Sequence, residues 1–139
     1  MKMKWLVDNN ILFAALKDTH AEHASSRAWL DKAKPDGWGV TVETYLGVIR
    51  KLMNPAAMDQ NQLKAAKAVD AVRQEFSGPY PGQIIIGGKP DDALLKKAQG
   101  HRQIMDFYLA QVARDTGAKL ATRDSGLLAE FPALTEYPA

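Results

Sequence analysis

Residues 5–16 read WLVDNNILFAAL, and this stretch indicates how the rest of the chain is built. The apolar run 5–7 has the length of a short buried strand and stops at Asp8, after which a turn leads into an apolar helix over 11–16. Further strands are expected at 38–42, 83–86, 119–122 and 134–137, and further helices at 21–33, 43–53, 59–76, 91–99 and 104–116. Alternating strands and helices predict an α/β protein with a parallel sheet covered on both faces.

Apolar periodicity and turn residues add detail to three of these segments. In helix 43–53 the apolar residues Leu46, Ile49, Leu52 and Met53 are expected to share the buried side. Helix 104–116 should end at Gly117, which can adopt the left-handed conformation of a helix end. The Gly- and Pro-rich residues around 77–88 indicate a surface loop, so residues 1–139 are expected to form one domain.

The composition excludes several classes of protein. The chain has no cysteine, which removes disulfides, thiolate metal sites and thiol nucleophiles. It has no apolar run near 18 residues and no secretion signal after Lys2 and Lys4, so a cytoplasmic protein with no membrane span is expected. The net charge of +2 says little about partners, although Arg50, Arg102 and Arg123 are candidates for contacts with a phosphate backbone.

Four acidic residues occupy the positions where parallel α/β proteins expose functional groups. Asp8 ends the first strand, Glu43 follows the second, and Asp124 follows the strand that ends at Thr122. Asp106 begins the helix before that strand, so it can reach the same edge of the sheet. Each acid alone could instead be a helix cap or a turn residue.

Convergent carboxylates repel one another unless a cation neutralises them. Because the chain offers oxygen ligands and no thiolate, the expected ion is Mg²⁺, or else Mn²⁺. Such an ion can activate water and stabilise charge on a phosphoryl oxygen, as the cleavage of a phosphodiester requires. A phosphoacceptor signalling domain with an acidic pocket is a weaker interpretation, because Lys119 precedes its strand rather than following it.

Three ordered motifs resemble the PIN-domain family. They are the apolar strand followed by Asp8 and Asn10, the helix that starts at Asp106 and ends before Gly117, and the strand end Thr122-Arg123-Asp124. Within that family, the segments HASSRAWL at 23–30, GVIR at 47–50 with Asn54-Pro55, and HRQ at 101–103 are similar to VapC-type toxins.

The resemblance implies a three-layer α/β/α fold with a mostly parallel central sheet. It also implies a magnesium-dependent endoribonuclease that acts on RNA, is neutralised by a VapB-type antitoxin and forms a homodimer. By position, Asp8, Asp106 and Asp124 would be metal ligands and Glu43 a further catalytic acid. Asn10 and Thr122 would support the site through hydrogen bonds.

One position departs from the family's pattern. VapC-type toxins with this arginine motif usually carry an acidic or amide residue two positions before the glycine, and here that residue is Tyr45. Glu43 is the substitute we expect, reaching the site from the strand–helix junction, because on a regular helix it would point about 200° away from Tyr45. If Glu43 does not reach, the alternative is a catalytically weakened or inactive PIN-like module that binds RNA or protein.

Overall fold

The computed structural model describes residues 2–139 and contains one five-stranded parallel sheet. Its strands are β1 (Trp5–Val7), β2 (Trp38–Thr41), β3 (Gln83–Ile85), β4 (Lys119–Ala121) and β5 (Thr135–Glu136). Their order across the sheet is β3-β2-β1-β4-β5, and every neighbouring pair is parallel. The expected α/β architecture is therefore confirmed, with β1 at the centre of the sheet.

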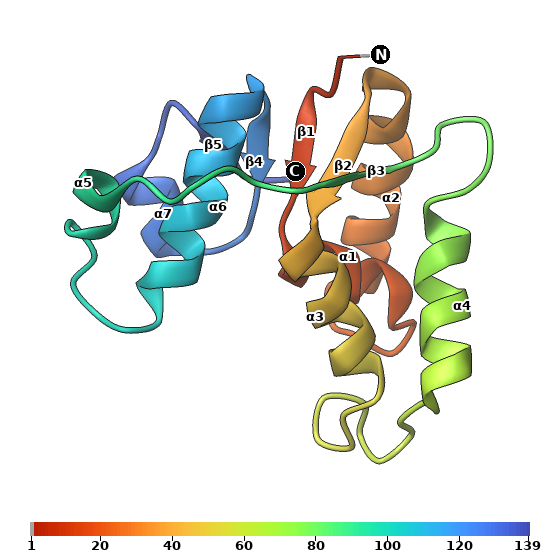
Figure 1. Cartoon of the computed structure of the whole chain (residues 1–139). Helices are drawn as coiled ribbons and strands as arrows, with labels where there is room; N and C mark the ends of the chain where they lie inside the picture. The colour runs from red at the N-terminus through yellow and green to blue at the C-terminus, as the bar shows by residue number, and fades with distance from the viewer. Residues whose placement is uncertain (1) are drawn as a thin grey trace.

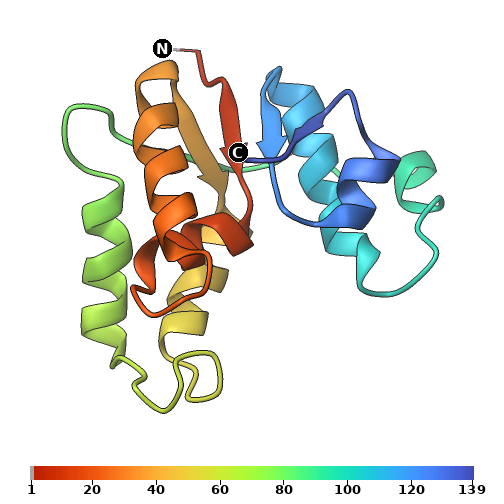
Figure 2. The same cartoon turned by 180° about the vertical axis from the view of Figure 1, so that it is seen from behind.

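Helices cover both faces of this sheet. They are α1 (Asn9–Leu16), α2 (His23–Ala33), α3 (Val42–Leu52), α4 (Ala65–Glu75), α5 (Asp92–Leu95), α6 (Gln103–Thr116) and α7 (Ser125–Glu130), with a 3₁₀ turn over Lys34–Asp36. Helices α1 to α4 lie on one side, and α5 to α7 lie on the other (Figures 1 and 2). The result is a three-layer α/β/α arrangement.

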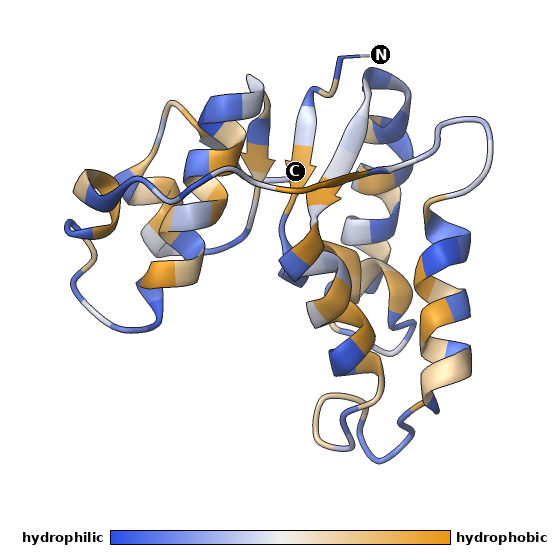
Figure 3. Ribbon diagram, viewed as in Figure 1, coloured by the Kyte–Doolittle hydropathy of each residue, from blue (hydrophilic) through white to orange (hydrophobic). Residues whose placement is uncertain are grey.

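The central strands divide the core into two apolar clusters. Trp5 and Val7 point into the cluster beneath α1 to α4, whereas Leu6 and Leu120 point into the cluster beneath α6 and α7. Successive side chains of a strand face opposite sides, so a strand buried on both faces is apolar throughout, as β1 is (Figure 3). No helix among residues 2–139 is long and apolar enough to cross a membrane.

Three sequence predictions for the helices are wrong in detail, in addition to the helix expected over 91–99, which extends only over Asp92–Leu95. Helix α4 begins at Ala65 rather than Asp59, because Asp59 and Gln60 adopt left-handed φ angles of 51° and 68° that a right-handed helix excludes. The buried face of α3 includes Val48 and Leu52, whereas Leu46 is 58% exposed and Met53 is 40% exposed.

Helix α7 is the third difference, because no helix was expected after β4. Its N-cap is Asp124, whose Oδ1 accepts a hydrogen bond from the Leu127 N–H at 2.9 Å. By contrast, the predicted end of α6 is confirmed: Gly117 has a φ of 72° and closes the helix in the left-handed region.

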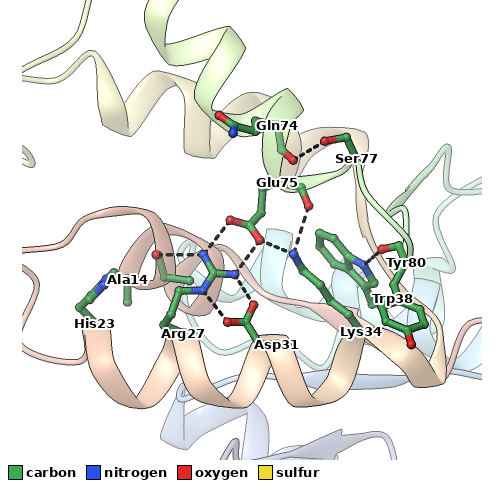
Figure 4. A network of polar contacts seen from close by, with 11 residues as sticks. Ala14, His23, Arg27, Asp31, Lys34, Trp38, Gln74, Glu75, Ser77 and Tyr80 are labelled. Atoms are coloured by element: carbon green, nitrogen blue, oxygen red, sulfur yellow. Dashed lines mark hydrogen bonds and ion pairs between the residues drawn. The ribbon is translucent and has the colours of Figure 1, made fainter.

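A polar network joins α2 to α4 on the outside of the first layer. The Arg27 guanidinium donates to both carboxylate oxygens of Glu75, at 2.7 and 2.6 Å, and Lys34 forms an ion pair with the same carboxylate (Figure 4). Arg27 also pairs with Asp31 one turn along α2. The Glu75 side chain is only 8% exposed, so this network fixes α4 against α2 through a nearly buried carboxylate.

Candidate active site

Asp8 lies at the centre of the carboxyl edge of the sheet. Its backbone N–H donates to the Ala121 carbonyl at 3.0 Å, which continues the β1–β4 pairing by one residue. Its Oδ1 accepts a hydrogen bond from the Asn9 N–H at 2.7 Å, so the carboxylate is the N-cap of α1. Asp8 is therefore both a helix cap and a residue of the site, and it is only 6% exposed.

Thr122 connects Asp8 to Asp124 across neighbouring strand ends. Its hydroxyl donates to Asp8 Oδ2 at 2.6 Å and accepts from the Asp124 N–H at 3.0 Å. One buried hydroxyl therefore holds the carboxylate at the end of β1 and the backbone at the end of β4. This is the hydrogen-bonding position expected of Thr122.

Glu43 and Asp106 line the same hollow as Asp8 and come from two other elements. Thr41 caps α3 by accepting from the Thr44 N–H at 3.1 Å, which starts the helix directly after β2 and places Glu43 in its first turn. Asp106 lies in the first turn of α6. A hollow of about 290 Å³ beside α6 and a smaller one of about 190 Å³ against β1 both include Glu43 in their walls.

We call the smaller hollow the acid pocket. Its walls are formed by Asp8, Asn9, Glu43, Thr44, Met105, Asp106 and Leu109. Three of the four predicted acids therefore line one pocket, and Asp124 lies close enough to act on Asp8 and Asp106 electrostatically.

Tyr45 does not face this pocket. Its ring packs edge-on against Phe76 at 5.2 Å, in the core beneath α3 and α4. Tyr45 is therefore a core residue at the position where the family carries an acid or amide, and Glu43, two positions earlier, lines the pocket.

The electrostatics of the site favour protonated carboxyls. Burial raises the pKa of Asp8, and the Asp124 charge raises it further, while hydrogen bonds from Thr122 and Asn9 act in the opposite direction. Burial, followed by the charges of Asp8 and Asp124, raises the pKa of Asp106 to about 6. Concentrated negative charge at a partly buried position is the condition that a bound cation would relieve.

The donors present are carboxylate, amide and hydroxyl oxygens, which suits a hard divalent cation. Within residues 2–139, however, no three Asp, Glu or His side chains already form a group close enough to hold a metal ion. The chemistry of the donors fits such an ion, and closer approach of the carboxylates would follow from binding it.

The two asparagines after Asp8 lie in different surroundings. Asn9 lines the acid pocket, whereas Asn10, the residue expected to support the site, lines a second pocket on the other side of α1. The Oδ1 atom of Asn10 is buried and accepts no hydrogen bond. Helix α1 begins at Asn9, and one residue of helix turns a side chain by about 100°, so neighbouring asparagines separate.

We call this second hollow the lysine pocket; it has a volume of about 290 Å³ and is lined by Asn10, Phe13, His20, Glu22, Lys51, Ala57 and Arg123. Arg123 is fixed there, with its Nε 2.5 Å from Glu22 and its Nη1 donating to Ser26 at 2.6 Å. Arg50 and Arg102 are exposed, and neither lines the acid pocket or the lysine pocket.

Asn9 and Lys51 are among the pocket residues that were absent from the sequence prediction. Asn9 could have been found from the helix start, because a cap at Asp8 places the next side chain at the same edge. Lys51 had no such signal, because its proximity to Asp8 depends on how α3 packs against α1.

Carboxylates from four separate segments at the carboxyl edge of an all-parallel sheet define an α/β protein with an acidic site at its strand ends. Residues 5–133 match the PIN domain family, and the chain belongs to it. It is 33% identical over 129 residues to Ribonuclease VapC29 of Mycobacterium tuberculosis (strain ATCC 25618 / H37Rv). This alignment covers 90% of the present chain and 89% of the relative.

Two other relatives from the same strain are similar over most of the chain. Ribonuclease VapC38 is 28% identical over 124 residues, with 88% of this chain and 86% of the relative covered. Ribonuclease VapC44 is 25% identical over 142 residues, with coverage of 98% and 93%.

Proposed function

We propose that this protein is a divalent-metal-dependent endoribonuclease of the VapC type, the toxin of a toxin–antitoxin pair. The observation that carries the proposal is the acid pocket, in which Asp8, Glu43 and Asp106 line one hollow at the strand ends. Three relatives that are named ribonucleases, each aligned over most of its length, support RNA as the substrate.

In this function Asp8, Asp106 and Asp124 would hold Mg²⁺ or Mn²⁺. When bound, such an ion neutralises charge on a phosphoryl oxygen and lowers the pKa of water, which are the two requirements of phosphodiester hydrolysis. The raised pKa of Asp106 and the raised pKa of Asp8 are consistent with carboxylates that gain a cation in the working protein.

The remaining residues position the reacting groups. Thr122 holds the Asp8 carboxylate in one orientation through a 2.6 Å hydrogen bond. Glu43 is exposed at the mouth of the acid pocket, where its carboxylate can accept a hydrogen bond from a water molecule or a ribose hydroxyl. Met105 and Leu109 contribute apolar side chains to the lining of the same pocket.

The relatives' names also support a protein partner. A toxin of this type is expected to be bound and neutralised by a VapB-type antitoxin, and to act on RNA in the cytoplasm as a homodimer. Co-expression with the protein encoded beside it, followed by size-exclusion chromatography with light scattering, tests both the complex and the dimer.

The catalytic proposal is tested by incubating RNA with the purified protein in Mg²⁺, Mn²⁺ or EDTA. Asp8→Asn and Asp106→Asn should each lower the cleavage rate by at least about 100-fold, because each removes a charge from the metal site. Asp70→Asn is the matched control, since Asp70 is exposed on α4, away from both pockets.

Cleavage that persists in EDTA, or full activity in both site variants, would contradict the proposal. Glu43→Gln tests whether Glu43 contributes to cleavage. A smaller loss of cleavage rate than in Asp8→Asn or Asp106→Asn is expected, because Glu43 only assists. Isothermal titration with Mn²⁺ gives a second readout, and weaker binding is expected in Asp8→Asn than in Asp70→Asn.

A further inference from the structure

The lysine pocket lies beside the acid pocket and has the opposite charge. The two hollows are separated by the first turn of α1, since Asn9 lines one and Asn10 lines the other. Helix α3 contributes to both, with Glu43 near its start and Lys51 near its end, about 12 Å apart along the helix axis. The two pockets therefore lie on either side of the first turn of α1, and Lys51 is close enough to interact electrostatically with Asp8.

Lys51 is the cation of this pocket that has no anionic partner within residues 2–139. Its Nζ lies 5.1 Å from the centre of the Phe13 ring, and it makes neither a hydrogen bond nor an ion pair there. By contrast, Lys17, whose Nζ lies 6.0 Å from the centre of the same ring, pairs with Asp59 at 2.8 Å. A half-buried ammonium that forms no ion pair is available to an anion from outside, although the charge of Asp8 acts on it from a greater distance.

The rest of the lysine pocket is built around a second, fixed cation. Arg123 is held by Glu22 and by the hydroxyls of Ser25 and Ser26, so it cannot swing out toward solvent without breaking these contacts. With Lys51 and Arg123 against the single carboxylate of Glu22, the charged side chains of the pocket sum to +1. The acid pocket, lined by Asp8, Glu43 and Asp106, carries only acidic charge when these are ionised.

The volume of the lysine pocket sets the size of the anion. At about 290 Å³ it corresponds to about ten water molecules at liquid density, which is enough for one phosphate group and part of its hydration shell. Because only the first turn of α1 separates the two hollows, an RNA strand that crosses this turn can place one phosphate in each of them.

We propose that Lys51 binds the backbone phosphate next to the one that is cleaved, with Arg123 supporting it from the far wall of the lysine pocket. This inference rests on the proposed function, because it needs an RNA strand across the acid pocket. In this proposal Lys51 is a binding residue. Lys51, rather than its exposed neighbour Arg50, is then the cation of α3 that contacts RNA.

The electrostatic relation of Lys51 to Asp8 agrees with this arrangement. Burial lowers the pKa of Lys51, while the charge of Asp8 opposes that change. A cation in the acid pocket would offset the attraction between Asp8 and Lys51 and leave the lysine to a phosphate.

The test compares Lys51→Met, Lys51→Arg and the exposed control Lys67→Met on α4. Methionine keeps an apolar side chain against Phe13, and thermal unfolding checks that each variant is folded. Binding of a fluorescently labelled single-stranded RNA is measured by anisotropy in EDTA, at several salt concentrations. Cleavage of the same RNA in Mg²⁺ gives kcat and KM.

Lys51→Met is expected to weaken RNA binding by about three- to tenfold at low salt. The slope of log K against log[salt] should become shallower by about 0.7, which is the change for one phosphate contact on a single strand. KM should rise by a similar factor with little change in kcat, because the contact is away from the reacting phosphate. Lys51→Arg should retain most of the affinity, and Lys67→Met should match the unmodified protein.

The inference is overturned if Lys51→Met keeps the salt slope of the unmodified protein, or if Lys67→Met loses as much. If the unmodified protein binds RNA but does not cleave it, the proposed function fails while the phosphate contact is still measured. If the unmodified protein neither binds nor cleaves RNA, both proposals fail.

Discussion

At the scale of single residues, the site depends on one hydroxyl. Thr122 is fully buried, and its Oγ1 contacts both the carboxylate of Asp8 and the backbone N–H of Asp124. A buried carboxylate oxygen that loses such a donor stays desolvated without compensation. The residue therefore affects stability as well as the orientation of Asp8.

Thr122→Val should lower the free energy of unfolding by about 1–3 kcal/mol, because valine keeps the shape but leaves Asp8 Oδ2 without its donor. Urea unfolding measures this loss, and Thr19→Val, at an exposed position, serves as the control. RNA cleavage should fall at the same time. A variant as stable as the unmodified protein would show that Asp8 does not need this bond.

Asp106 is expected to destabilise the folded, metal-free protein, so removing its charge should raise stability, whereas Thr122→Val lowers it. Its pKa of about 6 lies above the ordinary value of 3.8, so the folded state binds a proton more tightly than the unfolded state and is destabilised above about pH 6. This penalty shrinks as the pH falls through 6 toward 3.8.

In EDTA at pH 8, Asp106→Asn should therefore raise the Tm by a few degrees, roughly 2–5 °C, and the gain should shrink at pH 5. Differential scanning calorimetry at the two pH values measures the effect, with Asp70→Asn as the control. Adding Mn²⁺ at pH 8 should stabilise the unmodified protein more than Asp106→Asn, because only the former keeps all the acids. An equal metal response in both proteins would argue against Asp106 as a ligand.

At the scale of elements, the approach of α3 to α1 depends on Gly47. A Cβ atom at this position would lie 2.7 Å from the Asn9 Nδ2 atom, so the glycine leaves room for the Asn9 side chain in the acid pocket. The φ of Gly47 is not positive, and alanine is compatible with the helical backbone.

Gly47→Ala should therefore separate stability from activity. Alanine favours the helix by up to about 1 kcal/mol, while its methyl group displaces the Asn9 amide. We expect a Tm equal to or above that of the unmodified protein together with reduced RNA cleavage. Gly88→Ala, where a Cβ would meet nothing within 4 Å, is the control. Unchanged cleavage by Gly47→Ala would mean that the position of Asn9 is unimportant.

The network between α2 and α4 predicts an acid-sensitive contact. Burial alone would raise the pKa of Glu75, but hydrogen bonds from Arg27 and Lys34 outweigh burial and hold the pKa below its usual value. The unfolded state then binds the proton more tightly, so this contribution to stability is complete above about pH 4.3 and is lost as the pH falls through the folded-state pKa.

Glu75→Gln should lower the free energy of unfolding at pH 7 by roughly 2–3 kcal/mol, because it leaves Lys34 without its anion and Arg27 with Asp31 alone. The difference from the unmodified protein should decrease at pH 3. Urea unfolding at both pH values tests this, with Glu130→Gln at an exposed position as the control. A constant difference would show that the charge of Glu75 is not the stabilising element.

The elements that were predicted from sequence are those with strong local signals. The strand before Asp8 and the helix end at Gly117 depend on apolar runs and one glycine, and the structure confirms both. The start of α4 was wrong because the apolar spacing continues back to Leu63, which packs on the core although residues 61–64 are not helical. Periodicity could not separate a packed loop residue from a helical one.

At the scale of the whole molecule, the parallel topology explains why part of the site could be predicted. Strand ends that meet at one edge bring Asp8, Glu43 and the Thr122 segment together without any knowledge of side-chain packing. Helix rotation and helix contacts decide that Asn9 rather than Asn10 lines the acid pocket. They also decide which face of α3 is buried and where Lys51 lies. These are tertiary properties that a single sequence does not reveal.

The hydrogen bond between Thr122 and Asp8 spans 114 residues of chain. During synthesis on the ribosome, β1 emerges early but cannot pair with β4, or place its carboxylate beside the Thr122 hydroxyl, until the segment through Thr122 has left the exit tunnel. Every shorter nascent chain lacks the central β1–β4 pairing and the completed acid cluster. The carboxylate at the end of β1 is therefore oriented only late in synthesis, when most of the chain has already been made.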